Sequence, residues 1–146
     1  MEMEESLVIR PATAADAPAV AALLTDFNGE PTDAAASARR MAAMEGTETV
    51  LLALRGGAAV GLCSLRVVPF LSADHPYAEV TELYVAPQHR RQGIARRLMA
   101  EAEALARAKG APAVYLLTGF RNETAQAFYR SIGYGDYALA MRRRLV

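Results

Sequence analysis

The chain has 146 residues, of which 53% are hydrophobic and 22% are charged, a composition typical of one globular domain with a substantial core. Its 16 basic and 16 acidic residues cancel, so bulk charge gives no support to nucleic-acid or membrane binding. Cys63 is the only cysteine, which excludes an intramolecular disulfide. The acidic start, residues 1–5, lacks a secretion signal, and no apolar run approaches membrane-spanning length, so we expect a cytoplasmic protein.

The first half of the chain alternates between helix and strand patterns. In chain order we expect a strand, two helices and two strands, over residues 6–10, 13–28, 32–44, 49–54 and 58–68. Thr13 and Asp16 have the spacing of a helix cap. The pair Gly56-Gly57 predicts a tight hairpin turn, and the strand after it is expected to be interrupted or bulged near Gly61.

The second half begins with a predicted loop over 69–77, whose turn is expected at 74–76. The elements that follow are a strand, a helix, a strand, a helix and a strand, over residues 79–85, 93–109, 112–118, 122–132 and 137–145. The strand–helix–strand unit over 79–118 is expected to be parallel and right-handed. The order β-α-α-β-β-β-α-β-α-β predicts an α/β fold in which helices cover both faces of a mixed sheet, in one domain over 1–146.

One loop, residues 85–96, joins the predicted strand over 79–85 to the helix that follows it. Backbone N–H groups that open a helix have no partner inside it, and they lie at the positive end of the helix dipole, so they form a seat for phosphate. Gly93 lets an anion approach the main chain, and Ala95 keeps the next exposed position small. Positive charge around this seat comes from Arg90, Arg91, Arg96 and Arg97.

Two familiar phosphate loops do not match this segment. A P-loop would end in Gly-Lys-Ser/Thr, which is absent, and a dinucleotide fingerprint needs three glycines where this segment has only Gly93. The pattern Arg90-x-x-Gly93-x-Ala95 instead resembles the pyrophosphate loop of the GNAT-type N-acetyltransferases, which hold acetyl-CoA. By itself the pattern is also typical of an arginine-rich, solvated helix start.

A second motif decides between these interpretations. The residues Asn122-x-x-Ala125-x-x-Phe128-Tyr129-x-x-x-Gly133-Tyr134 match the second GNAT signature throughout, and one helix and one strand separate the two signatures. The chain is therefore identified from its sequence as similar to the GNAT-type N-acetyltransferases. This resemblance implies a GNAT fold, acetyl-CoA as co-substrate, and transfer of an acetyl group to a primary amine by direct attack in a ternary complex. No metal is expected, because no metal-ligand spacing occurs.

The resemblance also implies which residues hold acetyl-CoA. In the family, strands like those over 79–85 and 113–118 splay apart, the pantetheine arm lies between them, and the pyrophosphate sits on N–H groups like those of 91–96. The expected cofactor-binding set is Leu83, Tyr84, Val85, Arg90, Arg91, Gln92, Gly93, Ile94, Ala95, Arg96, Asn122 and Phe128. From local chemistry alone, Asn122 equally caps a helix, and Phe128 packs in the core with Ile132.

Acyl transfer to an amine needs a base, because an amine titrates near pH ~10 and must lose its proton before it attacks. Glu82 is the first candidate for this base, Glu79 the second and an ordered water the third. The alternative interpretation is that both glutamates are ordinary exposed strand residues. Tyr129, near the sulfur by resemblance, is the candidate acid for the departing thiolate, and a core tyrosine fits the same spacing. Cys63 is expected to be a buried hydrophobe rather than an acyl-carrying nucleophile.

The acceptor is expected to be a small-molecule or peptide amine. In the family the acceptor site is built by segments that correspond here to residues 27–33, 70–77 and 135–137, and acidic residues in or beside them favour a cationic amine. The alternative function is an acyl-CoA-binding regulatory module without turnover. Members of the family often pair, so a homodimer is an expectation, whereas nucleic-acid and membrane partners are not.

Overall fold

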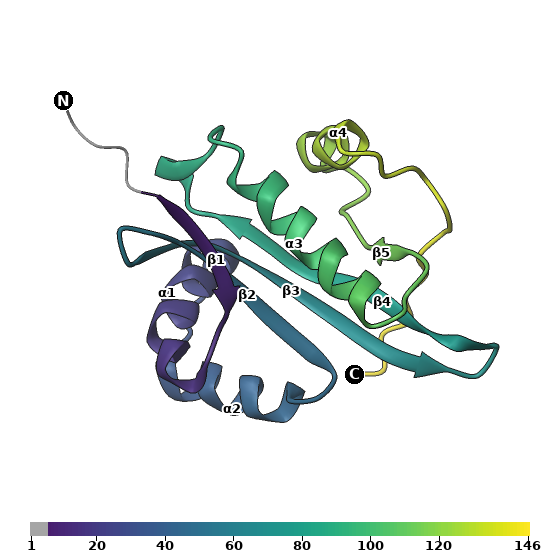
Figure 1. Cartoon of the computed structure of the whole chain (residues 1–146), viewed down its shortest axis with the longest axis horizontal. Coiled ribbons are helices and arrows are strands. Elements are labelled where there is room, and N and C mark those ends of the chain that lie inside the picture. The colour runs from purple at the N-terminus through teal and green to yellow at the C-terminus, as the bar shows by residue number, and fades with distance from the viewer. Residues whose placement is uncertain (1–5) are drawn as a thin grey trace. The chain divides into compact units, whose positions relative to one another are not determined.

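The computed structural model describes residues 6–146, so the acidic start, residues 1–5, lies outside the described residues. The chain forms two compact units, one that runs to Tyr115 and one that begins at Leu116. The elements, shown in Figure 1, are β1 (Leu7–Pro11), α1 (Ala17–Asn28), α2 (Ala34–Met44), β2 (Glu48–Arg55), β3 (Ala58–Phe70), β4 (Ala73–Val85), α3 (Ile94–Ala108), β5 (Val114–Leu116) and α4 (Glu123–Ser131). No helix within residues 6–146 combines the length and the hydropathy that crossing a bilayer requires.

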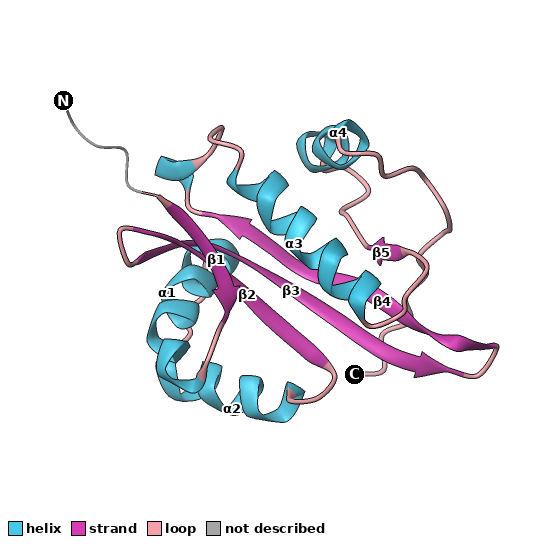
Figure 2. Ribbon diagram, viewed as in Figure 1, coloured by secondary structure: helices cyan, strands magenta, loops and turns pink. Residues whose placement is uncertain are grey.

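Five strands form one mixed sheet in the order β1-β2-β3-β4-β5. Strands β1 to β4 make an antiparallel meander, which Figure 2 shows as successive magenta arrows. Gly56 and Gly57 have φ values of 56° and 79°, which glycine adopts at little cost, and they make the predicted hairpin turn between β2 and β3. The helix α3 then connects β4 to β5 at the edge of the meander.

Helices cover both faces of the sheet, as the element order predicts. On one face, α1 packs on β2, β3 and β4 through a buried cluster of Val20, Leu23, Leu52, Leu62 and Tyr84. Side chains alternate along a strand, so Gly61 faces the opposite side from Leu62. There α3 approaches closely, because a Cβ at Gly61 would lie 2.9 Å from the carbonyl oxygen of Tyr84 and 3.4 Å from Leu98. Gly61 is therefore needed where α3 rests on the sheet.

A bulge in β3 supports the end of β4. Val60 is an extra residue opposite the step from Ala53 to Leu54, which confirms the bulge expected near Gly61. The carbonyl of Val60 accepts a 2.9 Å hydrogen bond from the N–H of Ala86, directly after β4. The irregular strand thus holds the first residue of the loop that leads to α3.

A second bulge lies in β4 itself. Thr81 is an extra residue there, because Ser64 pairs with Glu82 while Leu65 pairs with Val80. A bulge twists its strand locally and re-aims the neighbouring side chains. Residues directly opposite each other in a strand pair share a face, so Glu82 and Ser64 lie on the face that α1 covers.

The hairpin between β3 and β4 is longer than predicted. The loop expected over 69–77 is wrong, because β3 continues to Phe70 and β4 begins at Ala73. The ring of Phe70 lies 5.3 Å from that of His75 and 6.3 Å from that of Tyr77, and these cross-strand contacts stabilise the extended chain. Side-chain packing thus outweighed the local turn preference of residues 74–76.

The last strand, expected over 137–145, is not formed, and the element order of residues 6–146 ends at α4. Figure 2 accordingly draws the chain after α4 as a loop. A strand needs a neighbour for its N–H and C=O groups, and β5 has only 3 residues where 112–118 were expected. The apolar side chains of Tyr137, Leu139 and Met141 are 80%, 72% and 88% exposed, so they gain no burial that would favour an extended conformation.

Candidate active site

The helix α3 begins without a side-chain cap. Its N-cap residue is Gly93, at a φ of 78°, and the N–H of Arg97 donates to the carbonyl of Gly93 at 3.1 Å as the first helical hydrogen bond. The N–H groups of Ile94, Ala95 and Arg96 therefore have no acceptor within the helix. They lie at the positive end of the helix dipole, which is the arrangement that binds anions.

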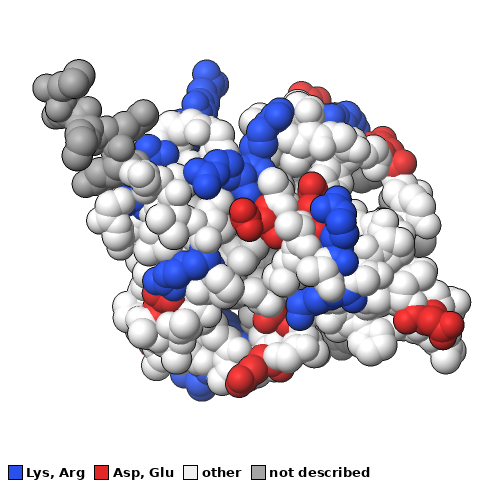
Figure 3. Space-filling view, viewed as in Figure 1, with Lys and Arg blue, Asp and Glu red and all other residues white. Residues whose placement is uncertain are grey.

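The loop before α3 carries a strained residue and a cluster of positive charge. Arg91 has a φ of 61°, the one positive value outside glycine in residues 6–146, and this conformation costs an L-residue about 1–2 kcal/mol. Left-handed residues of this kind turn successive N–H groups toward one side of the loop, where they form an anion-binding concavity. Arg91, Arg96 and Arg97 are exposed, and Figure 3 shows basic side chains that stand out over this loop.

Arg90 folds back onto the end of β4. Its Nε donates a 3.0 Å hydrogen bond to the carbonyl of Val85, and its guanidinium lies 5.6 Å from the ring centre of Tyr84. The ring of Tyr84 in turn lies 5.1 Å from that of Phe27 at the end of α1. Arg90 thus braces the loop against β4, a role that sequence reasoning missed when it treated Arg90 as a source of charge and a cofactor-binding residue.

The expected arm-binding residues occupy the last positions of β4, directly before the loop. Tyr84 and Val85 are buried, at 7% and 8% exposure, and Leu83 is half-buried. Their side chains therefore belong to the protein interior. A ligand at this edge would meet mainly their main-chain groups, as the resemblance implies.

Glu82 has an unusual environment on the face that α1 covers. Burial raises the pKa of its carboxyl, and the charge of Glu48 raises this pKa further. Glu48 accepts two hydrogen bonds at Oε2, from Ser64 Oγ at 2.6 Å and from Thr81 Oγ1 at 2.9 Å. Within residues 6–146, no side chain forms a hydrogen bond or an ion pair with Glu82. Sequence reasoning missed this cluster, whose only signal was the recurrence of polar residues on three strands.

Glu79 is committed to other partners. Its Oε2 accepts a 2.9 Å hydrogen bond from the hydroxyl of Tyr77 and a 3.1 Å bond from the guanidinium of Arg66. Burial, together with this bond to Glu79, raises the pKa of Tyr77 to about 12. The ring of Tyr77 also stacks on that of Tyr115, with centroids 5.0 Å apart. The two glutamates of β4 thus differ, since Glu79 is held in place and Glu82 is not.

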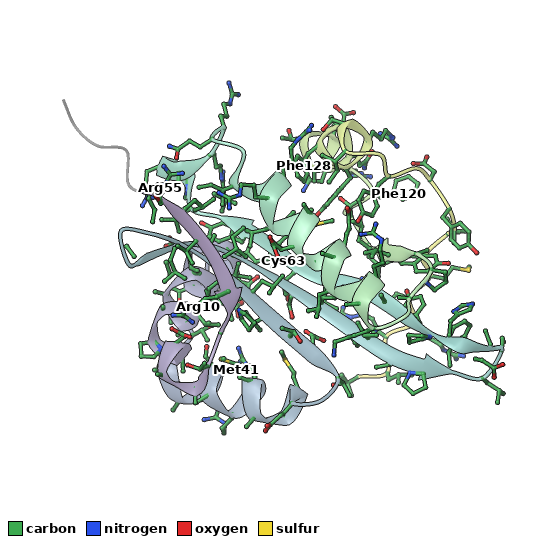
Figure 4. The ribbon with its side chains drawn as sticks, viewed as in Figure 1. Arg10, Met41, Arg55, Cys63, Phe120 and Phe128 are labelled. Atoms are coloured by element: carbon green, nitrogen blue, oxygen red, sulfur yellow. The ribbon has the colours of Figure 1, made fainter. Side chains whose placement is uncertain are left out.

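Cys63 is a fully buried residue of β3, and Figure 4 shows it on the strand beneath α3. Burial raises the pKa of its thiol to about 12, and Glu103 of α3 adds to the effect. A thiol that stays protonated and has no exposed surface is a poor nucleophile. This agrees with the expectation of a buried hydrophobe. Within the part of the chain that the structure describes, no three His, Cys, Asp or Glu side chains gather as metal ligands would.

In the second unit, α4 carries the residues of the second signature, among them Phe128, which Figure 4 labels. The Oδ1 of Asn122 accepts a 3.1 Å hydrogen bond from the N–H of Ala125, so its side chain caps the helix. The ring of Tyr129 lies 5.3 Å from that of Phe128 and 6.0 Å from that of Tyr134. These neighbours restrict the orientation of the Tyr129 ring.

The segments expected to line an acceptor site have different structures. Residues 27–33 comprise the end of α1 and the link to α2. Asp33 caps α2, since its Oδ1 accepts a 2.7 Å hydrogen bond from the N–H of Ala36. Phe27 contacts Tyr84, which places the start of this segment on the same sheet face as Glu82. Residues 70–77 belong to the long hairpin rather than to a loop.

The sequence matches the model of one known protein family. The model of the acetyltransferase (GNAT) family matches residues 18–134, which contain both signatures and parts of both compact units. The chain belongs to the GNAT acetyltransferase family. The family assignment made from the two signatures is therefore confirmed, and with it the expectation of a family of acyltransferases that use acetyl-CoA.

Among relatives of this GNAT chain, the aminoalkylphosphonate N-acetyltransferase of Salmonella typhimurium is 40% identical over 83 residues, which cover 57% of this chain and 54% of that protein. The chain thus spans about half the length of the curated relatives it matches, 54% in the first two.

Solved structures match over nearly their whole length. An aminoglycoside N-acetyltransferase in complex with CoA has a TM-score of 0.86 at 16% identity, over 100% of this chain and 99% of the other. A Trypanosoma brucei acetyltransferase has a TM-score of 0.84 at 21% identity, over 96% of this chain and 100% of the other. At these identities the likeness shows the fold alone, and it confirms the predicted GNAT fold.

Proposed function

We propose that this GNAT chain is an N-acetyltransferase that moves the acetyl group of acetyl-CoA to a primary amine by direct attack in a ternary complex. The observation that carries the proposal is the uncapped start of α3, behind a strained and basic loop, in a chain of this family. Residues 1–146 are proposed to act as one GNAT domain.

The loop and the helix start fit the diphosphate of coenzyme A. N–H groups of 91–96 supply donors, and Arg91, Arg96 and Arg97 supply charge that balances two phosphates. The main chain of residues 83–85 is proposed to hold the arm, with Asn122 and Phe128 of α4 completing the binding set. When bound, acetyl-CoA supplies an activated thioester, and the protein supplies orientation and proton transfer.

Glu82 is the proposed base. An attacking amine must lose a proton, and a carboxylate with a raised pKa accepts it more readily than an ordinary glutamate does. Glu79 is disfavoured because Tyr77 and Arg66 occupy its Oε2. An ordered water between the amine and Glu82 is compatible with the same role.

Tyr129 is the proposed acid, which returns a proton to the departing thiolate. A thiol titrates near ~8.5, so the thiolate needs only modest help to leave. The main-chain N–H of Val85 is proposed to face the oxygen on which negative charge develops. Direct attack is favoured over an acyl-enzyme because Cys63, the only cysteine, is buried and its pKa is raised to about 12.

The proposed acceptor is a small-molecule or peptide amine. A relative named an aminoalkylphosphonate N-acetyltransferase supports a small amine. The contact of Phe27 with Tyr84, on the sheet face of Glu82, supports a role for residues 27–33 in binding the amine. We further propose a homodimer, because members of the family often pair. A cytoplasmic location is proposed from the sequence.

Release of free thiol from acetyl-CoA in the presence of an amine panel tests this function, with calorimetry of CoA binding in parallel. We expect CoA to bind and thiol to appear only when a suitable amine is present. Binding without release for every amine would instead favour a regulatory module. Absence of CoA binding would overturn the proposal as a whole.

The substitution Glu82→Gln tests the base. We expect kcat/KM to fall about 100-fold near neutral pH, where the free amine is protonated and needs a base. At high pH the amine is already neutral, so the gap between variant and wild type should narrow. A pH–rate profile that matches the wild-type profile would remove Glu82 from this role, and Glu79→Gln serves as the matched comparison.

A further inference from the structure

We infer that Glu48 is a positioning residue for Glu82: it holds a second carboxylate beside the proposed base and so keeps that base ready to take a proton. The inference rests on the proposed function. It assigns a role to a residue of β2 that lies outside both GNAT signatures and outside every segment expected to bind a substrate.

The strand register places the two glutamates on one sheet face. Ser64 of β3 stands directly opposite Glu82 of β4, and the side chain of Glu48 reaches Ser64 from β2. The bulge at Thr81 brings a second hydroxyl to the same point. Three neighbouring strands thus converge on one small polar cluster beside Glu82.

Two hydroxyls fix the position of Glu48. Ser64 Oγ and Thr81 Oγ1 both donate to Oε2, at 2.6 Å and 2.9 Å. Ser64 is 3% exposed, so water offers its hydroxyl little alternative to Glu48. A carboxylate held by two donors on two strands keeps its distance from Glu82, and its charge therefore acts on Glu82 steadily.

The cation that the strand register brings next to this pair is engaged elsewhere. Arg66 stands opposite Glu48 in the β2–β3 register, yet its guanidinium is paired with Glu79, which also takes the hydroxyl of Tyr77. Across residues 6–146, neither Glu48 nor Glu82 takes part in an ion pair.

The helices on this face carry their charged residues at the surface. Tyr84 fills the next position on the face with a buried ring, and Phe27 of α1 covers that ring. The charged residues of α1 and α2, which are Asp26, Arg39 and Arg40, are exposed.

The unneutralised pair has a defined consequence for proton transfer. When the amine is deprotonated, its N–H bond breaks and an O–H bond forms at Glu82, so one of two adjacent negative charges is removed. The like charge of Glu48 and the partial burial of Glu82 both favour that protonated form. Without the charge of Glu48, Glu82 would be a weaker base.

The test compares Glu48→Gln with Glu48→Asp in the full chain. Gln keeps an oxygen that accepts from Ser64 and Thr81 but removes the charge, whereas Asp keeps the charge but has a shorter reach. The readouts are kcat/KM against pH and the NMR titration of the Glu82 carboxyl in glutamate-labelled protein, assigned with Glu82→Gln. The exposed Glu101 of α3 provides the control Glu101→Gln, and thermal melting shows that each variant is folded.

We expect Glu48→Gln to move the Glu82 titration and the acid limb of the profile to lower pH, and to lower the plateau rate about twofold to tenfold. Glu48→Asp should stay closer to wild type, and Glu101→Gln should match it. An unchanged Glu82 titration in Glu48→Gln would overturn the inference, as would a larger shift in the Asp variant. Lack of thiol release by the wild type would instead count against the proposed function, and the NMR titration distinguishes that failure from this one.

Discussion

The helices α4 and α3 begin in opposite ways, although each starts within a GNAT signature. At α4, the side chain of Asn122 accepts a 3.1 Å hydrogen bond from the N–H of Ala125, as Asp33 does for Ala36 at α2. At α3, the corresponding position is Gly93, which has no side chain to offer.

The difference shows that the N–H groups at a helix start can either be capped by the chain itself or be left to bind a ligand. Every helix starts with N–H groups that lack an internal partner. Where the chain supplies a carboxylate or an amide, the helix is closed by its own side chain. Where it supplies glycine, next to the left-handed Arg91, the donors are left for an external anion.

The largest effect is expected at α4, the helix that its own side chain caps. There a substitution should lower the catalytic rate without changing the affinity for CoA. Tyr129→Phe removes the proposed acid but keeps the ring contacts with Phe128 and Tyr134. We expect kcat to fall about 100-fold, while calorimetry shows little change in CoA affinity. Glu123→Gln, at an exposed residue of the same helix, is the control and should behave as wild type. A normal kcat in Tyr129→Phe would leave α4 with a binding role only.

The second prediction concerns the uncapped start of α3. Gly93→Asp places a carboxylate beside the free N–H groups at the start of α3, where its negative charge would compete with phosphate for them. The loss of charge-assisted hydrogen bonds, about 3 kcal/mol in all, should raise the Kd for CoA about 100-fold by calorimetry. The control is Gly29→Asp, because Gly29 has a φ of 72° and so imposes the same backbone strain away from the loop. Equal CoA binding by both variants would show that the start of α3 is not the phosphate seat.

The third prediction concerns the strained residue beside the open helix. Arg91→Gly relieves the positive φ of 61° but removes one charge. Urea unfolding should show a gain in the free energy of unfolding of up to about 1 kcal/mol. CoA binding should weaken by about tenfold and depend less on salt. Effects of the same sign on both quantities would contradict a strain kept for anion binding.

The smallest effect is expected from removing the cap of α4. Asn122→Ala should lower the free energy of unfolding by about 1 kcal/mol, whereas Asn122→Asp keeps an acceptor and should not. Binding of CoA sharpens the comparison, because an amide N–H that donates to the ligand would be lost in both variants. If both bind CoA as the wild type does, Asn122 is a cap alone.

Features that depend on neighbours in the chain were predictable. The Gly56-Gly57 turn and the helix start at Gly93 each follow from a few consecutive residues, and the two signatures were enough to name the family. The predicted final strand failed because its stability depends on a partner strand, and β5 proved to be only 3 residues long. The extended hairpin over 69–77 depended likewise on contacts between Phe70 and the opposite strand.

The sequence by itself determined the family, most of the elements and the loop that is suited to a phosphate group, because these depend on local chemistry and short motifs. Only the tertiary structure decided that Glu79 of β4 is hydrogen-bonded to Tyr77 and Arg66 while Glu82 is not held in this way. It also decided that Glu48 stands by Glu82 and that Arg90 braces β4. These facts depend on strand register, where a shift by one residue moves a side chain to the opposite face. Two bulges set that register, and no local pattern in the chain locates both of them.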